Sequence, residues 1–216
     1  MMMSARLDLV IFDCDGVLVD SELLANRVLA EAVTALGIDM DAGEAMQTFR
    51  GLKMAECVRQ IEKRLGRTVP HTFLSDFRTR ESDAFKRDLR PVDGITHVLE
   101  NLSTPFCVAS NGPREKIDLS LGITRLRPHF SDRIFSAYDV GCWKPDPGLF
   151  LHAATTLGVA PGRCVVVEDS VTGVTAAASA GMCVFGYAAA KEDESSLSAA
   201  GATTFNAMRD LPNLLR

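Results

Sequence analysis

Short apolar runs alternate with longer segments of helical periodicity along most of the chain. The runs are rich in branched and small side chains, which is typical of strands buried on both faces; they span residues 7–12, 106–110, 133–136, 164–167, 182–185 and 203–205. The helical segments between them include 92–102, 114–121, 147–157 and 171–180. Repeated strand–helix units predict an α/β fold with a mainly parallel sheet covered by helices on both faces.

The pattern changes between the first strand and Pro91. Residues 21–90 contain only segments of helical periodicity, with no strand candidate. Pro91 marks a boundary, because proline interrupts regular structure. We therefore expect a doubly wound, Rossmann-like core domain formed by residues 1–20 and 91–216. An inserted α-helical cap domain, residues 21–90, would stand over the ends of the strands.

The first strand ends in two carboxylates one residue apart, in the sequence Asp13-Cys14-Asp15-Gly16. Side chains alternate along an extended chain, so Asp13 and Asp15 begin on the same side. Two negative charges held so close repel each other unless a cation or a shared proton intervenes. In open α/β sheets, ligands bind beyond the carboxyl ends of the strands. The structural alternative is a polar turn whose aspartate caps the next helix.

Polar residues also follow three other strands. They are Ser110 and Asn111 after the second strand, Lys144 in the loop after the third, and Glu168 and Asp169 after the fourth. Each has a structural explanation of its own: a turn, a surface lysine and a helix cap. Their joint occurrence at successive strand ends predicts one functional site.

These residue types suit phosphoryl chemistry at a metal ion. Asp13, Asp169 and a backbone oxygen of Asp15 are hard oxygen ligands of the kind that Mg²⁺ prefers. Lys144 and the Ser110 hydroxyl could bind a phosphoryl group. The sequence has no Gly-rich phosphate loop and no Ser/His or Cys/His catalytic motif, and we expect its four histidines to be surface or packing residues. The remaining nucleophile is a carboxylate, since aspartate can form an acyl phosphate.

Composition excludes several classes of function. The net charge of −5 over 216 residues gives no case for nucleic-acid binding, and no apolar run is long enough to span a membrane. The N-terminus lacks the pattern of a secretory signal. Four of the six cysteines, Cys14, Cys107, Cys164 and Cys183, lie in or beside predicted core strands. We expect buried, reduced thiols and a cytoplasmic protein that is a monomer or a weak homo-oligomer.

Charge is unevenly distributed along the chain. Residues 50–90 hold eleven Lys/Arg and six Asp/Glu, a net charge of +5, whereas the rest of the chain carries −10. A basic segment in an acidic protein can attract an anionic small molecule. Solvated helix faces explain the same imbalance equally well.

Four motifs in order, DCDGVLVDSE, ASNG, WKPDP and VVVEDS, resemble those of the haloacid dehalogenase superfamily of phosphohydrolases. The resemblance covers nearly the whole chain, and the helical insert after the first motif agrees with it. Within the superfamily the chain is similar to the β-phosphoglucomutase-like branch with a helical cap. The resemblance implies a Mg²⁺-dependent phosphatase for a small phosphorylated metabolite, either a sugar phosphate or a sugar-acid phosphate.

The resemblance also implies a role for each site residue. Asp13 would be the nucleophile, and Asp15 would protonate the leaving alcohol and then activate water. Mg²⁺ would be held by Asp13, the Asp15 carbonyl and Asp169, with Glu168 acting directly or through a metal-bound water.

Two further groups of residues would bind the substrate. Ser110, Asn111 and Lys144 would hold the phosphoryl oxygens. Arg50 and Lys53, in the loop FRGLKM, would meet the rest of the substrate, and two cations there suit a second anionic group such as a carboxylate. The alternative for Arg50 and Lys53 is that they are exposed loop charges.

Three other activities remain as alternatives. A phosphosugar mutase of this branch carries a histidine after the first motif, where this chain has Ala25. A dehalogenase lacks the second aspartate of the DxD pair. A signalling receiver-like module also uses aspartates, a lysine and Mg²⁺, but the helical insert and the DxD spacing argue against it.

Overall fold

The computed structural model describes residues 7–215, which form two compact units. The first unit combines the N-terminal segment up to Val19 with the chain from Pro91 onward. The second unit is Asp20–Arg90. Among the described residues, no helix has both the length and the apolar character that a membrane crossing requires.

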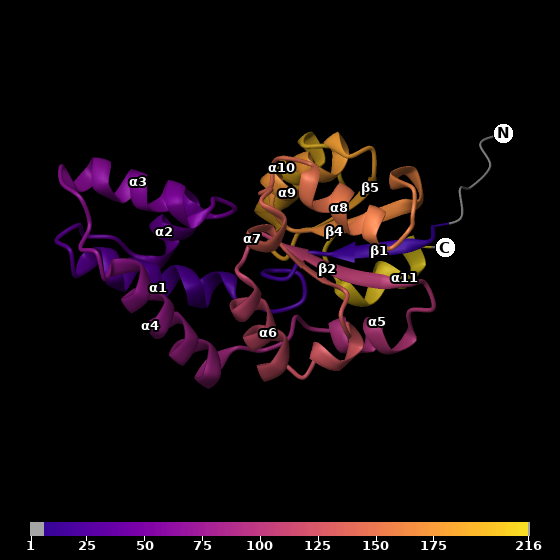
Figure 1. Ribbon diagram of the computed structural model, residues 1–216, viewed down its shortest axis with the longest axis horizontal. Helices are drawn as coiled ribbons and strands as arrows, with labels where there is room; N and C mark the ends of the chain where they lie inside the picture. Colours follow the sequence, from indigo (N-terminus) through magenta and orange to yellow (C-terminus); the bar gives the residue numbers. More distant parts are fainter. Residues whose placement is uncertain (1–6, 216) are drawn as a thin grey trace. The chain divides into compact units, whose positions relative to one another are not determined.

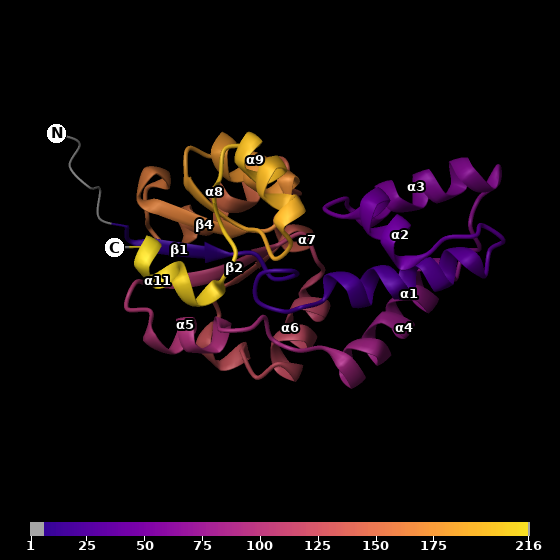
Figure 2. The ribbon, with the colours of Figure 1, turned by 180° about the vertical axis from the view of Figure 1, so that it is seen from behind.

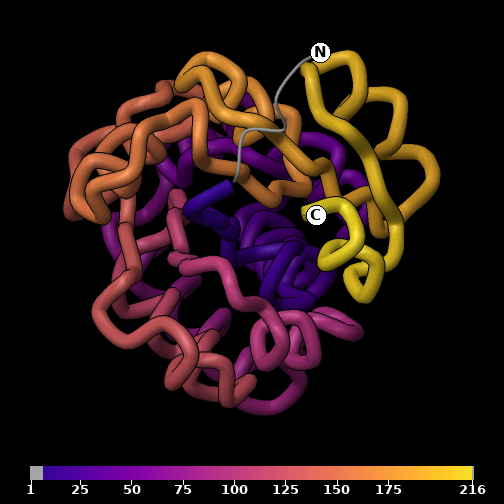
Figure 3. Tube along the Cα trace, turned by 90° about the vertical axis from the view of Figure 1, so that its right-hand side faces the viewer, coloured from indigo at the N-terminus to yellow at the C-terminus, as the bar shows by residue number. Residues whose placement is uncertain are grey.

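The described part of the first unit contains a six-stranded sheet in which all neighbouring strands are parallel, in the order β3-β2-β1-β4-β5-β6. The strands are β1 (Leu9–Phe12), β2 (Phe106–Ser110), β3 (Ile134–Ser136), β4 (Cys164–Glu168), β5 (Cys183–Tyr187) and β6 (Thr203–Phe205). The predicted α/β fold with a parallel sheet is therefore confirmed. Figure 3 shows β1, in indigo, between the magenta segment that contains β2 and the orange segment that contains β4.

Helices cover both faces of this sheet. They are α5 (Ile95–Asn101), α6 (Arg114–Ile123), α7 (Ala137–Val140), α8 (Gly148–Thr156), α9 (Val171–Ser179), α10 (Glu194–Ala199) and α11 (Leu211–Leu214). Short 3-10 helices span Arg127–His129, Pro161–Arg163, Lys191–Asp193 and Met208–Asp210. Figures 1 and 2 show α8, α9 and α10 on one face and α5, α6 and α11 on the other. Apolar residues of α8, α9 and α10 pack in one cluster with the strands, which explains why these helices carry so many small and aliphatic side chains.

The three central strands end within two residues of one another in register. Phe12, the last residue of β1, lies opposite Val108 of β2 and Val167 of β4. The backbone of Asp13 continues this register, since its N–H donates to the carbonyl of Val167 at 3.0 Å. Residues that follow β1, β2 and β4 are thereby brought to one edge of the sheet.

The second unit is helical throughout its regular structure, as the sequence predicts. Its helices are α1 (Glu22–Thr34), α2 (Ala42–Phe49), α3 (Met54–Leu65) and α4 (Phe73–Asp88). Helix α1 packs on α2 and on α4, and the unit buries a core that includes Val33, Phe49, Phe77 and Phe85. The Asp41 side chain caps α2 by accepting from the N–H of Glu44 at 2.8 Å.

Two local expectations are wrong. Cys183 is exposed rather than buried, although it is free, as are the other three cysteines expected to be reduced thiols. Helix α8 begins at Gly148, one residue later than the predicted segment 147–157, and Asp146 Oδ1 accepts from the Gly148 N–H at 2.7 Å.

Candidate active site

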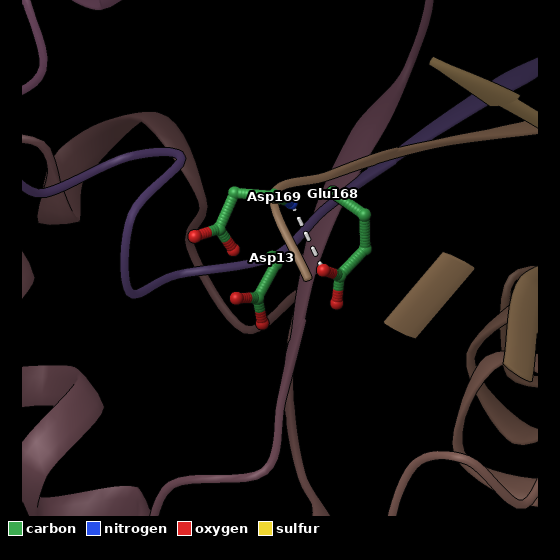
Figure 4. Close-up of side chains that lie close together, drawn as sticks. All are labelled: Asp13, Glu168 and Asp169. Atoms are coloured by element: carbon green, nitrogen blue, oxygen red, sulfur yellow. Dashed lines mark hydrogen bonds between the residues drawn. The ribbon is translucent and has the colours of Figure 1, made fainter. Parts of the chain in front are cut away.

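Three carboxylates from two neighbouring strands converge in the first unit. Asp13 follows β1, Glu168 ends β4 and Asp169 follows it. All three are buried, and one carboxylate oxygen of each lies within 4.8 Å of those of the other two. Figure 4 shows the three groups facing the same space. Among the residues that the structure describes, this is the cluster with the geometry to hold a metal ion.

Lys144 lies against two of these carboxylates. Its Nζ donates to Asp13 Oδ1 at 2.7 Å and to Glu168 Oε1 at 2.6 Å, and it also lies 4.8 Å from the centre of the Phe150 ring. The lysine comes from the loop between α7 and α8, and the core packing of α8 fixes where that loop ends. One ammonium beside three carboxylates leaves a buried excess of negative charge when all the groups are ionised.

The pKa values of Asp13 and Lys144 reflect this excess of negative charge. Burial raises the pKa of Asp13 well above its usual value, and the charges of Glu168 and Asp169 raise it further, against the opposing effect of Lys144. Burial lowers the pKa of Lys144, but the charges of Asp13 and Glu168 outweigh it and raise that pKa above its usual value. The carboxylates around Lys144 therefore favour its cationic form, and an additional cation would favour the ionised form of Asp13.

Glu168 is held by the start of the next helix. Its Oε2 accepts from the N–H groups of Asp169 and Ser170, both at 3.0 Å, and from the Ser170 hydroxyl at 2.9 Å. Ser170 Oγ in turn caps α9 by accepting from the Gly173 N–H at 3.1 Å. The helix cap that the sequence offered as an alternative does form at the start of α9, and Ser170 provides it. Glu168 instead directs Oε1 at Lys144.

Two glycines make room for the carboxylates. A Cβ at Gly173 would overlap the carboxylate of Glu168, and one at Gly16 would overlap that of Asp169. Gly16 also has a φ of +76°, which residues with a side chain rarely adopt. Larger residues at these two positions would displace the acidic cluster.

Ser110 and Asn111 lie at the end of β2, and their side chains bond to the backbone of neighbouring loops. The Ser110 hydroxyl accepts from the Gly112 N–H at 3.1 Å. Asn111 Oδ1 accepts from the Lys144 N–H at 2.9 Å, and Asn111 Nδ2 donates to the Lys144 carbonyl at 3.4 Å. The Asn111 amide therefore fixes the backbone of Lys144, a role that sequence reasoning did not assign.

Asp15 takes a different partner from Asp13. Its Oδ2 lies 3.0 Å from Nζ of Lys116, near the start of α6. Sequence reasoning gave Lys116 no role. One sequence signal for this contact was available: Lys116 comes six residues after Ser110, in the first turn of the helix that follows β2.

Arg50 and Lys53 belong to the second unit. Arg50 follows α2, and its Nε lies 4.0 Å from Glu22 Oε2 at the start of α1. Lys53 precedes α3 and is exposed. Their part in substrate binding stays a prediction.

The donor set of the cluster fits Mg²⁺. It offers carboxylate oxygens only, which are hard ligands, and it has the excess negative charge that a divalent cation would balance. Asp13 and Asp169 are the residues best suited to hold the ion, because the Glu168 oxygens already accept hydrogen bonds from Lys144 and from the start of α9.

Comparison with known proteins agrees with this geometry. The chain is 35% identical over 211 residues to the 6-phosphogluconate phosphatase of Escherichia coli, covering 97% of this chain and 95% of that protein. A haloacid dehalogenase (HAD) family hydrolase from Deinococcus radiodurans, whose structure contains bound phosphate and sodium, is 30% identical to this chain. The TM-score is 0.81, and the match covers 98% of this chain and 96% of that one.

A protein from Thermotoga maritima described as a candidate β-phosphoglucomutase is 26% identical with a TM-score of 0.78, covering 97% of this chain and 98% of that one. The family model for haloacid dehalogenase-like hydrolases matches residues 7–181. That span includes every residue of the acidic cluster and Lys144. The chain therefore belongs to the haloacid dehalogenase-like hydrolases, as its four motifs predict.

Proposed function

We propose that this protein is a Mg²⁺-dependent phosphatase that hydrolyses a small phosphorylated metabolite through an aspartyl phosphate on Asp13. The observation that carries the proposal is the buried cluster of Asp13, Glu168 and Asp169 with the Lys144 ammonium bonded to it. Free cysteines support a reducing compartment, so we place the reaction in the cytoplasm.

The first half of the reaction transfers the phosphoryl group to the protein. A carboxylate oxygen of Asp13 forms a bond to phosphorus while the bond from phosphorus to the leaving alcohol oxygen breaks. Asp15 gives its proton to that oxygen, so the alcohol leaves neutral. Lys144, together with Mg²⁺ held by Asp13 and Asp169, would balance the charge of the phosphoryl oxygens, which is the chemistry that the ion supplies.

The second half releases phosphate. Asp15, now ionised, takes a proton from a water molecule whose oxygen attacks phosphorus, and the bond between phosphorus and Asp13 breaks. Asp13 and Asp15 thereby return to their starting states. Asn111 keeps Lys144 in place through both halves by its bonds to the Lys144 backbone.

For the substrate we propose a sugar phosphate or a sugar-acid phosphate, with 6-phosphogluconate as the first candidate. The relative from E. coli carries that substrate in its name and matches almost the whole chain. Arg50 and Lys53 add two cations in the second unit, which suits a carboxylate distant from the phosphate.

A phosphosugar mutase is the second candidate, favoured by the Thermotoga relative. The residue at the position of the mutase histidine is Ala25, in α1, which has no group to transfer a proton. A phosphatase is therefore the better proposal.

Purified protein is expected to release inorganic phosphate from 6-phosphogluconate with many turnovers per molecule in Mg²⁺, and to lose more than about 100-fold of that rate after chelation. A panel of hexose 6-phosphates run in parallel ranks the substrates by kcat/KM. Movement of phosphate between positions of a sugar would instead support the mutase. A single stoichiometric labelling without turnover would support a receiver-like module.

Arg50→Ala is expected to lower kcat/KM for 6-phosphogluconate by about 10- to 100-fold, the scale of one charge-assisted hydrogen bond. The same variant should hydrolyse 4-nitrophenyl phosphate at close to the wild-type rate, since that substrate has no carboxylate. Arg59→Ala, which removes another arginine of the same unit from α3, serves as the control. Equal losses on both substrates would remove the case for recognition by Arg50.

A further inference from the structure

Lys116 donates a hydrogen bond to Asp15, which lies two residues after the first aspartate of the acidic cluster. Lys116 Nζ lies 3.0 Å from Asp15 Oδ2, and both side chains are 21% exposed. Asp15 is only two residues from Asp13, yet the metal-holding group found among the described residues is made of Asp13, Glu168 and Asp169. The Asp15 carboxylate therefore bonds Lys116, whereas the Asp13 carboxylate bonds Lys144.

The backbone on the Asp15 side is fixed. Residues 14–19 form a tight turn in which the Leu18 and Val19 N–H groups both donate to the Cys14 carbonyl, at 2.9 and 3.1 Å. The Gly16 N–H donates to the Val19 carbonyl at 2.9 Å. Because the turn sets the Cα–Cβ direction of Asp15, the remaining freedom is the rotation of its side chain.

The backbone on the Lys116 side is also fixed. Arg114 donates from Nη1 to the Ile134 carbonyl of β3 at 3.2 Å and from Nε to Asp118 Oδ2 at 2.9 Å. The Ser136 hydroxyl donates to the Gly112 carbonyl at 2.7 Å, which ties the loop before α6 to β3. The first turn of α6 is thus anchored to the sheet, and Lys116 is carried to one place beside Asp15.

These contacts matter because Asp15 is two residues from Asp13, whose carboxylate bonds Lys144 and belongs to the metal-binding cluster. An Asp15 carboxylate turned into the cluster would compete for the ion or for Lys144 and would point away from the leaving oxygen. A proton donor must lie within hydrogen-bond reach of the atom that it protonates.

We propose that Lys116 is a positioning residue, whose ammonium holds the Asp15 carboxyl group out of the metal cluster and aimed at the leaving alcohol. The inference rests on the proposed function of Asp15 as proton donor. It adds a residue that acts through Asp15 and touches neither the metal nor the transferred phosphoryl group.

The test compares Lys116→Met, which removes the charge, with Lys116→Arg, which keeps it. The substrates are aryl phosphates whose leaving phenols have increasing pKa, assayed as kcat/KM in Mg²⁺. Lys116→Met is expected to lose about threefold with 4-nitrophenyl phosphate, and about 10- to 100-fold with phenyl phosphate, since the poorer leaving group needs the proton more. The dependence of kcat/KM on leaving-group pKa thus becomes steeper, and Lys116→Arg restores most of the wild-type slope.

Lys191→Met, which removes an exposed lysine from the same unit, is the control and should leave the slope unchanged. An equal loss on every aryl phosphate would overturn the inference, because it would mark Lys116 as a structural or phosphate-binding residue. A rise in KM alone, with an unchanged slope, would do the same. A wild-type protein without turnover on any of these esters would refute the proposed function itself, which separates the two failures.

Discussion

Asp13→Asn is expected to abolish turnover, with a loss of about 10⁴-fold or more in kcat on any phosphate monoester, the scale found when a catalytic nucleophile is removed. The amide has nearly the size of the carboxylate, but it cannot form the acyl phosphate. Phosphate release in Mg²⁺ measures the loss. Mass spectrometry of acid-quenched protein should find no phosphorylated species in the variant.

The fold should survive this substitution. Burial raises the pKa of Asp13, which means that its charged form is disfavoured in the folded protein, and the neutral amide removes that cost. Lys144 keeps its bond to Glu168 Oε1. Circular dichroism should therefore give a melting temperature close to that of the wild type. Asp139→Asn, at an exposed position of α7, is the control and should keep full activity; ordinary turnover by Asp13→Asn would refute the nucleophile.

The sheet could be predicted because its strands are short, apolar and buried on both faces. Every residue of β1, β2 and β4 is buried, so the runs that encode them contain no polar residue until their carboxyl ends. The exposure of Cys183 could not be predicted from its run. The short edge strand β6 pairs only from Phe185 onward, which leaves the start of β5 without that neighbour.

The acidic cluster could be predicted for a related reason. Once β1 and β4 are parallel neighbours, the residues that follow them meet at one edge, so Asp13, Glu168 and Asp169 converge. The partner of Asn111 could not be predicted, because it depends on the course of the loop that carries Lys144. For the partner of Asp15, the sequence offered only a lysine in the first turn of α6. Hydrophobic periodicity reports which residues face the core, but it carries no information on where a loop directs a polar side chain.

Lys144→Met is expected to reduce both stability and activity, in contrast to Asp13→Asn. Removing the ammonium leaves Glu168 and Asp13 buried without their common cation, and breaking a buried ion pair in this way costs about 3–5 kcal/mol of unfolding free energy. For a chain of this length that corresponds to a fall in melting temperature on the order of 10 °C. Turnover should fall by about 10²- to 10³-fold, since a charge that stabilises the transition state is lost.

Two further variants separate this explanation from a simple loss of packing. Lys86→Met removes a lysine that also lies near an aspartate, at 3.3 Å from Asp83, but on the surface of α4; it should change stability by less than about 1 kcal/mol. Adding Glu168→Gln to Lys144→Met should recover part of the lost melting temperature, because it removes one of the two stranded charges, yet it should recover no activity. Mg²⁺ should also stabilise Lys144→Met more than the wild type, since the ion would replace part of the missing positive charge. If Lys144→Met melts like the wild type, or if Glu168→Gln lowers its stability further, the charge balance assigned to this cluster is wrong.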